Sequence, residues 1–238
     1  LMARVGRPLA QQTSPMTASL SPTARTTLTR HRERGSDDRA DLFAVLEEAL
    51  VCHVGIVRDG QPVVLPSIFA VDRDGPDEGG TLYLHGSVAA PWLAQAPQTP
   101  VCATFTLVDA AVIARASFSH SMNYRSAVVM GAARRVDDEA EREHALRLIV
   151  DHVIPGRAGT LRPNSRKELA ATAVLAVPLA EASVKARTGG PVDEPDDVAS
   201  GTWAGLVPLS ITAGEIQAAT DGPVPDDVLR RVAGWSAR

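Results

Sequence analysis

Three polar residues, Tyr124, Arg125 and Ser126, open a segment that otherwise resembles a β-strand. The stretch FSHSMNYRSAVVMGAARRV, residues 118 to 136, starts with hydrogen-bonding side chains and continues with apolar ones. Arg125 and Ser126 offer hydrogen bonds to a phosphate, and each Arg–oxygen bond contributes on the order of 1.5–3 kcal/mol. Tyr124 offers a flat face to a planar ring. The alternative is that Arg125 forms a structural ion pair at a sheet edge.

A second group of donors lies in LYLHGSVAAPWL, where a predicted strand ends in His85, Gly86 and Ser87 and passes directly into a short predicted helix. Gly86 allows the backbone to approach a ligand, Ser87 supplies a hydroxyl, and the free N–H groups of the helix start face the same point. This arrangement is typical of an anion-binding turn. A strand-to-helix turn capped by Ser87 explains the same residues without a ligand.

Pro66 and Ser67 interrupt the apolar strand pattern VVLPSIFAV. Proline has no N–H and is confined to edge strands or bulges, so we expect a bulged edge that leaves backbone groups free for a ring system. Together, the three segments provide a cation, hydroxyls, backbone donors and an aromatic ring. That combination suits a phosphorylated, planar ligand held near one end of a small barrel.

Other chemistry has little support in the sequence. There is no GxGxxG, P-loop, HExxH or CxxC motif, and the six histidines have no metal-ligand spacing on a shared element. No combination of residues indicates a nucleophilic triad. We therefore expect neither a metal site nor acid–base catalysis by side chains.

Composition narrows the class of protein. The chain has 238 residues, is 45% hydrophobic and carries a formal net charge of −4, which argues against bulk nucleic-acid binding. Its two cysteines, Cys52 and Cys102, lie in apolar runs and are expected to be reduced thiols in a reducing compartment. No apolar run approaches the roughly 18 residues of a membrane span. These features predict a cytoplasmic protein.

The pattern of elements predicts a mainly β fold with flanking helices. Ser36 is the expected N-cap of a first helix, and Asp59-Gly60 between two β-rich runs is a strong hairpin signal. Asp109 is expected to mark a bend, after which a strand runs from about Tyr124 to Val136. Further expected elements are strands in 81–87, 101–116, 172–188 and 202–209, a brief helix in 88–95, an amphipathic helix in 137–156 and a C-terminal helix from about Pro225.

Because strand and helix do not alternate regularly, an antiparallel split β-barrel fits better than a parallel sheet. We expect three parts: a flexible N-terminal arm over residues 1–29, the barrel domain over 30–212 and a C-terminal helical extension over 213–238. Arg30, Arg32 and Arg34 follow the arm and offer phosphate contacts, but a solvated basic stretch is the preferred explanation.

Several blocks in their order resemble the pyridoxamine 5′-phosphate oxidase-like flavin-binding proteins, with most similarity to the nitroimidazole-resistance-type branch. They are TRHRERGSDDRADLFAVLEEALVCHVGIVRDGQPVVLPSIFAVD, TLYLHGS, FSHSMNYRSAVVMGAARRVDDEAEREHALRLIVDHVIPG and TGGPVDEPDD…WAGLVPL, spanning about Thr29 to Leu209. The resemblance implies a split barrel that forms a homodimer, with FMN in a cleft at the subunit interface.

By the same resemblance, residues of this chain take roles in flavin binding. His85, Gly86 and Ser87 match the strand that meets the flavin phosphate and ribityl chain, and Tyr124, Arg125 and Ser126 match a second phosphate-side block. Leu65, Pro66 and Ser67 fall where a strand passes the isoalloxazine ring. Trp203 lies in a C-terminal block that comes close to the site in relatives.

The implied function is an FMN-dependent oxidoreductase that passes electrons from a reduced nicotinamide nucleotide to a small acceptor, either nitro-aromatic or quinone-like. The alternatives are a deazaflavin-dependent reductase of the same fold and a flavin-binding protein without turnover. Haem binding through His53, His85 or His120 is a weaker hypothesis. The additional basic residues and the C-terminal substrate-binding segment of true pyridoxamine phosphate oxidases are not found, so vitamin B6 oxidation is not expected.

Overall fold

Two antiparallel sheets form the body of the protein in this computed structural model, which describes residues 19–20, 23–95 and 99–236. The seven-stranded sheet has the order β1 (Gly35–Ser36), β10 (Ala182–Arg187), β7 (Ser121–Ala132), β6 (Pro100–Ile113), β2 (Cys52–Arg58) and β3 (Gln61–Ser67), with β11 (Gly205–Pro208) paired to β6. The four-stranded sheet has the order β4 (Phe69–Asp72), β5 (Thr81–Ser87), β9 (Thr172–Pro178) and β8 (Arg134–Arg135).

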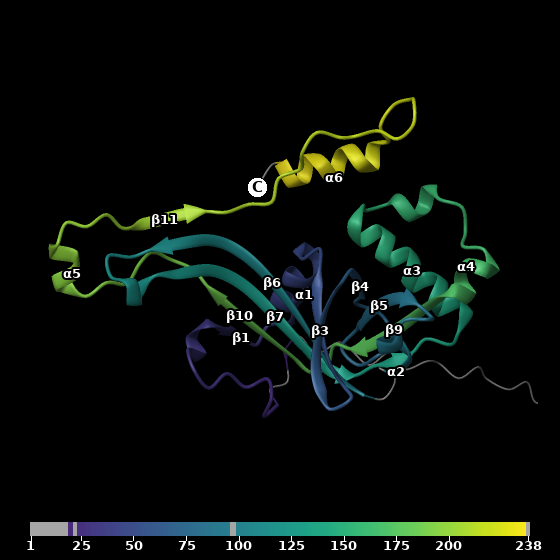
Figure 1. Ribbon diagram of the computed structural model, residues 1–238, viewed down its shortest axis with the longest axis horizontal. Coiled ribbons are helices and arrows are strands. Elements are labelled where there is room, and N and C mark those ends of the chain that lie inside the picture. Colours follow the sequence, from purple (N-terminus) through teal and green to yellow (C-terminus); the bar gives the residue numbers. More distant parts are fainter. Residues whose placement is uncertain (1–18, 21–22, 96–98, 237–238) are drawn as a thin grey trace, which may run out of the picture.

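Helices flank these sheets (Figure 1). They are α1 (Arg39–Glu48), α2 (Pro91–Gln95), α3 (Glu139–Val153), α4 (Arg166–Ala171), α5 (Pro195–Ala199) and α6 (Asp226–Ser236), with short 3-10 turns at Arg32–Arg34, Ser117–Ser119 and Arg157–Thr160. The expected fold class is therefore confirmed as a split barrel of antiparallel strands with flanking helices. The barrel is not closed by hydrogen bonds, because its strands form two separate sheets.

The main hydrophobic core lies between the sheets and α1. Leu42 and Leu46 of α1, Phe105 of β6 and Leu82 and Leu84 of β5 are fully buried in it. A smaller apolar cluster joins the other face of the four-stranded sheet to α3 through Tyr83, Ala145 and Ile149. The body is thus arranged in layers in which helices cover the sheet faces.

The β2–β3 hairpin confirms the turn predicted at Asp59-Gly60. Asp59 has φ 51° and Gly60 has φ 74°, so both central residues adopt left-handed backbone conformations. This is the turn that matches the twist of two antiparallel strands. The expected bend at Asp109 is confirmed as well, since the β6–β7 register shifts between Val108 and Ala110.

Some predicted boundaries differ from the structure. The helix N-cap is Asp38 rather than Ser36, because the Asp38 carboxylate accepts the N–H of Ala40 at 2.8 Å. The strand expected over Tyr124 to Val136 begins at Ser121 and ends at Ala132. Arg134 and Arg135 instead form β8 in the other sheet, since the chain crosses between sheets at this point.

The N-terminal region packs on the body in its described part. Leu20 is buried in the core, and Thr23 and Arg25 both donate to the carboxylate of Glu181. Residues 1–18 and 21–22 of the predicted arm lie outside the described residues. Across the described part of the chain, no helix has both the length and the apolar character needed to cross a membrane.

Candidate functional site

Arg125 lies on the inner face of the seven-stranded sheet, the face that carries the buried row Val54, Ala103 and Val129. Side chains alternate along β7, so Arg125 points toward α1 like Ala127 and Val129. Its Nε and Nη2 donate to Asp109 at 3.1 and 2.7 Å. Its Nη1 and Nη2 donate to Glu48 at 2.7 and 3.1 Å. The alternative of a structural ion pair therefore describes this arginine.

The two carboxylates define the electrostatics around Arg125. The hydrogen bonds to Asp109, followed by those to Glu48, raise the pKa of the guanidinium above its ordinary value. One cation beside two carboxylates leaves this place with net negative charge, which is unfavourable for a phosphate. The role of Arg125 toward a phosphate stays a prediction.

Tyr124 and Ser126 lie on the opposite, outer face of the same sheet. Both are half-buried, and Ser126 Oγ donates to the carbonyl oxygen of Lys185 at 3.1 Å. The polar start of the strand is thus divided: the cation faces the core side and the hydroxyls face outward.

The outer face carries a patch of hydroxyls and nitrogen donors, of which the sequence indicated only Ser126, for phosphate, and His53, for haem. Thr106, Ser126 and Lys185 are cross-strand neighbours on β6, β7 and β10. His53 and Thr104 are neighbours on β2 and β6. We call these five residues the outer polar patch. The signal that could have found the others is the alternation of apolar side chains with Thr104 and Thr106 along β6.

The charge of the outer face suits an anion better than the inner face does. Around the patch, β2, β6, β7 and β10 present outward Gly55, Val57, Cys102, Val108, Tyr124, Val128, Met130 and Ser183, none of them acidic. A phosphate there would meet hydroxyls and the Lys185 ammonium without an opposing carboxylate.

Leu65, Pro66 and Ser67 lie on β3, at the edge of this sheet, as expected for a strand that contains proline. The predicted bulge is wrong, because the β2–β3 register is continuous from Ser67 to Gln61. Pro66 is exposed on the outer face beside His53, whereas Leu65 and Ser67 point to the inner face. Of these three residues, Pro66 shares a face with the outer polar patch.

His85, Gly86 and Ser87 belong to the other sheet, on β5. Ser87 Oγ accepts the N–H of Ala89 at 3.2 Å, which is the capped turn given as the alternative to an anion site. A Cβ on Gly86 would lie 2.6 Å from Leu93 Cδ1, so the glycine admits α2 rather than a ligand. Among the described residues, no hydrogen bond or ion pair joins this segment to Tyr124, Arg125 or Ser126.

The imidazole of His85 is unusual because its Nδ1 is buried and no described residue forms a hydrogen bond with it. It shares the face of β5 that carries Tyr83 and faces α3. Burial lowers the pKa of His85, which keeps the ring neutral at pH 7. A neutral imidazole whose Nδ1 is not engaged retains its capacity to ligate a metal through that nitrogen.

Trp203 is remote from the other candidates within one chain. It precedes β11, whose Gly205 pairs with Ile113 of β6, and its side chain is 67% exposed. Ile113 lies nine residues beyond Thr104 on β6, which corresponds to roughly 30 Å along the strand. The structure does not bring Trp203 to the outer polar patch of its own chain.

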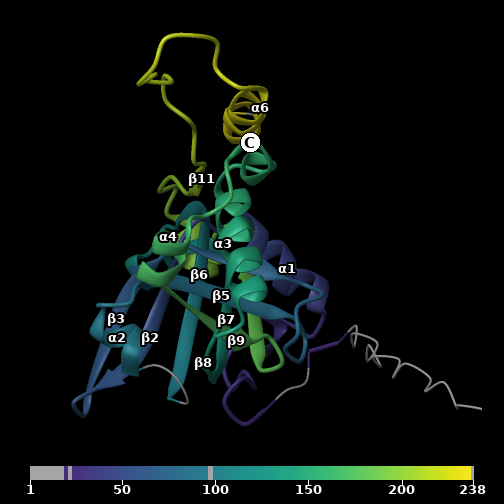
Figure 2. The ribbon, with the colours of Figure 1, turned by 90° about the vertical axis from the view of Figure 1, so that its right-hand side faces the viewer.

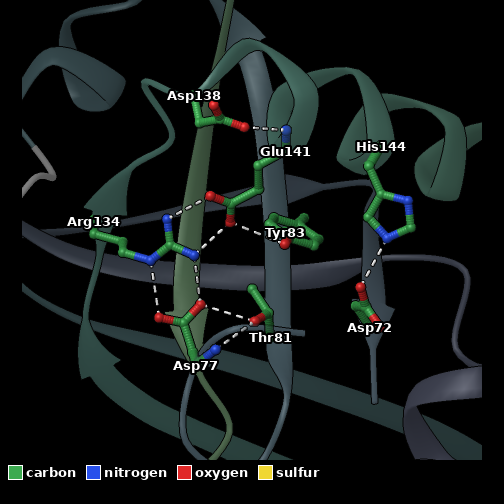
Figure 3. A network of polar contacts seen from close by, with 8 residues as sticks. All are labelled: Asp72, Asp77, Thr81, Tyr83, Arg134, Asp138, Glu141 and His144. Carbon is green, nitrogen blue, oxygen red and sulfur yellow. Dashed lines mark hydrogen bonds and ion pairs between the residues drawn. The ribbon is translucent and has the colours of Figure 1, made fainter. Parts of the chain in front are cut away.

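A second polar cluster, between β5, β8 and α3, has its charged groups paired (Figure 3). Arg134 donates to Asp77 at 2.8 and 2.9 Å and also binds Glu141, which accepts a 3.0 Å hydrogen bond from Tyr83 Oη. Asp77 accepts a further hydrogen bond from Thr81 at 2.8 Å. This network fastens α3 to the sheet, and the charged groups of Asp77, Arg134 and Glu141 are paired with one another.

Comparison with known proteins agrees with this architecture. The family model described as pyridoxamine 5′-phosphate oxidase matches residues 38–186. Nothing among the curated proteins matches. The solved structure of the flavocytochrome Anf3 from Azotobacter vinelandii is 35% identical, with a TM-score of 0.79 over 89% of this chain and 98% of that one.

Two further solved structures are similar to this chain. The FAD and haem binding protein from Mycobacterium smegmatis is 37% identical, with a TM-score of 0.75 over 85% of this chain and 97% of that one. A putative 5-nitroimidazole antibiotic resistance protein from Bacteroides thetaiotaomicron is 27% identical, with a TM-score of 0.52 over 63% and 85%. The family match covers more than half of the sequence and these structures share its fold. The chain therefore belongs to the pyridoxamine 5′-phosphate oxidase family.

Proposed function

We propose that this protein binds a flavin against the outer face of its seven-stranded sheet and acts as a flavin-dependent oxidoreductase. The observation that carries the proposal is the outer polar patch, where hydroxyls and Lys185 stand among described outward residues of β2, β6, β7 and β10 that include no carboxylate. The similarity to a flavocytochrome and to an FAD and haem binding protein, both above 30% identity over most of the chain, supports it.

The residues of the patch have separate roles in this proposal. Thr106, Ser126 and Lys185 would bind the flavin phosphate, and Tyr124 and Pro66 would lie along the flavin. The bound flavin supplies hydride and one-electron chemistry. The protein positions it and excludes water, so no side chain need act as acid or base. Arg125 supports this face from behind by fixing β7 to α1.

The preferred form of the cofactor is FAD. The sequence predicted FMN, with deazaflavin as the alternative, but the 37%-identical relative is described as binding FAD and haem. The purified protein should be yellow, and mass spectrometry of the compound released on denaturation identifies FAD, FMN or a deazaflavin. A colourless protein with no affinity for any of the three would refute flavin binding.

We propose a homodimer in which the outer faces of two copies enclose the flavin. Val57 and Val64 are 67% and 63% exposed on this face of the β2–β3 hairpin, and an apolar surface of this kind is typical of a protein interface. Dilution of the dimer to monomers should release the flavin. Monomers that retain it would contradict a shared site.

The proposed reaction passes electrons from a reduced nicotinamide nucleotide to a nitro-aromatic or quinone-like acceptor. Anaerobic mixing with NADH or NADPH should bleach the oxidised flavin absorbance, and addition of an acceptor should restore it. Flavin that stays oxidised with both donors would favour the alternative of a flavin-binding protein without turnover.

Haem binding is a second candidate function, favoured by His85. Two relatives above 30% identity are described as a flavocytochrome and an FAD and haem binding protein. His85 has a neutral ring and a buried Nδ1 that no described residue hydrogen-bonds. We expect a Soret band on haem titration that disappears in His85→Ala and persists in His120→Ala. A band lost only in His53→Ala would assign the ligand to His53 instead.

A further inference from the structure

A cavity of about 290 Å³ lies between the chain that precedes α1 and strand β10. Leu20, Leu28 and Val184 contribute apolar walls, and Thr27 and Ser183 contribute hydroxyl groups. Small-molecule sites are typically concave, mostly apolar and equipped with a few polar groups that orient the ligand, at volumes from about 300 Å³ upward. This cavity therefore has the size and lining of a site for one ring system with a polar substituent.

Two side chains of opposite charge also line the cavity, those of Arg32 and Asp37. Both residues are exposed, and neither side chain forms an ion pair or hydrogen bond with another described residue. The neighbouring acid Glu33 contacts His31 and Arg34 instead. A cation and a carboxylate thus stand in one cavity without neutralising each other, which leaves both available to a ligand.

The cavity borders the outer polar patch. Gly35 is the cross-strand partner of Lys185, and a Cβ on Gly35 would lie 2.7 Å from Leu28 Cδ1, so Leu28 lies over the outer face of β1. Lys185 Nζ donates to the carbonyl oxygen of Arg30 at 3.4 Å. Ser183, which lines the cavity, lies two residues before Lys185 and on the same face of β10. A ligand in the cavity would therefore adjoin the proposed flavin site.

Helix α6 of the same chain lies away from this cavity. The chain before β1, drawn in purple, is at the end of the molecule opposite α6 in two perpendicular views (Figures 1 and 2). The lining itself comes from the chain before α1, including β1, and from β10. The cation, the carboxylate and the hydroxyl groups of the cavity therefore all belong to one chain.

The lining suits an adenosine phosphate. A guanidinium such as that of Arg32 forms charge-assisted hydrogen bonds to phosphate oxygens. A carboxylate such as that of Asp37 accepts hydrogen bonds from the hydroxyl groups of a ribose, as an acidic residue does in dinucleotide-binding folds. Leu20 and Leu28 would contact the purine ring. A phosphate on the ribose 2′-oxygen would instead meet the Asp37 carboxylate, and this like-charge contact is unfavourable.

We propose that this cavity binds the adenosine diphosphate group of a dinucleotide whose ribose has no 2′-phosphate. The inference rests on the proposed function and extends it, because two compounds in that proposal carry this group. FAD differs from FMN by an adenosine phosphate attached at the flavin phosphate, which the proposal places at Lys185. NADH carries the same adenosine diphosphate, whereas NADPH has the 2′-phosphate that Asp37 would repel.

Calorimetric titration of the whole chain with ADP, after removal of any bound flavin, tests the cavity itself. The native protein should bind ADP, and Arg32→Ala should weaken this binding at least about tenfold. The control Arg58→Ala, which removes an exposed arginine beside Asp59, should leave it unchanged. ADP should bind at least about tenfold more tightly than adenosine 2′,5′-bisphosphate, and Asp37→Asn should reduce this preference to about threefold. No binding of ADP, or unchanged binding in Arg32→Ala, would overturn the inference.

Competition identifies which compound supplies the group and separates this inference from the flavin proposal. If FAD supplies it, FAD should bind at least about tenfold more tightly than FMN, Arg32→Ala should remove most of this advantage, and bound FAD should block ADP. If NADH supplies it, ADP should bind the flavin-loaded protein and slow flavin reduction by NADH but not by dithionite. Flavin binding and reduction that ADP and Arg32→Ala leave unchanged would refute the inference and leave the flavin site intact. Binding of ADP through Arg32 by a protein without affinity for flavin would refute the flavin proposal and leave the cavity assignment intact.

Discussion

Arg125 and Glu48 form a two-pronged ion pair between β7 and the end of α1, with N–O distances of 2.7 and 3.1 Å. Asp109, at the irregularity of β6, accepts two more hydrogen bonds from the same guanidinium. One side chain thereby joins a helix end, a strand and the bend of its neighbouring strand. The arginine that the sequence suggested for phosphate binding connects elements of the scaffold.

Replacement of Arg125 by Ala should lower the free energy of unfolding by about 1–3 kcal/mol, because Glu48 and Asp109 are left without their shared cation. Urea unfolding followed by circular dichroism measures this. The control is Arg135→Ala, whose pair with Asp137 is mostly exposed and should contribute at most about 1 kcal/mol. An Arg125→Ala protein of unchanged stability that no longer binds flavin would restore the phosphate role.

The pH at which the protein unfolds in acid should depend on Arg134. Burial by itself raises the pKa of Asp77, but hydrogen bonds from Arg134 and Thr81 outweigh it and hold the pKa below its ordinary value of 3.8. A depressed carboxylate pKa stabilises the fold above pH 3.8, and this contribution is lost as the pH falls below it. Arg134→Met should therefore shift acid unfolding to higher pH and cost about 1–3 kcal/mol near pH 7.

The comparison for this experiment is Tyr83→Phe, which removes a hydrogen bond to Glu141 but none to Asp77. It should lower the free energy of unfolding by about 1 kcal/mol evenly between pH 2 and 7, so the pH dependence of that free energy should match the native protein's. Circular dichroism between pH 2 and 7 follows both variants. If Arg134→Met and the native protein unfolded at the same acid pH, Arg134 would not be the group that stabilises the Asp77 carboxylate.

The two cysteines should differ strongly in reactivity. Cys52 is fully buried, and burial raises the pKa of its thiol from 9.0 to about 12, so its thiolate fraction at pH 8 is about a thousandfold smaller than that of an ordinary thiol. Cys102 is half-buried on the outer face. Iodoacetamide should modify Cys102 in the folded, flavin-free protein diluted to monomers and Cys52 only after unfolding, as peptide mass mapping will show. Rapid labelling of Cys52 would contradict its burial.

The hairpin at Asp59-Gly60 should require glycine for its backbone conformation. Gly60 has φ 74° and open space where a Cβ would stand, so Gly60→Ala costs about 1 kcal/mol through backbone strain alone. Gly214→Ala is a matched control, because Gly214 also has open space but no positive φ. Thermal unfolding should lower the melting temperature in the first variant and leave it unchanged or higher in the second.

Local signals in the sequence were sufficient to predict most of the helices and strands. The β2–β3 turn, the bend at Asp109, α3 and the start of α6 after Pro225 all appear as predicted. Turn chemistry and side-chain periodicity act over a few residues, so they can be read without tertiary information. The order of the motifs along the chain was also sufficient to identify the family.

The sequence by itself therefore determined the strands, the main helices and the family, whereas the tertiary structure decided which face and which sheet each polar residue occupies. Arg125 and Ser126 are adjacent in sequence but point to opposite faces, and His85 lies in a different sheet from both. Arg125 binds Glu48, 77 residues away, although nothing near either residue indicates the pairing. Partners of this kind are fixed by how sheets and helices pack across the whole chain, and local sequence patterns carry no information about that packing.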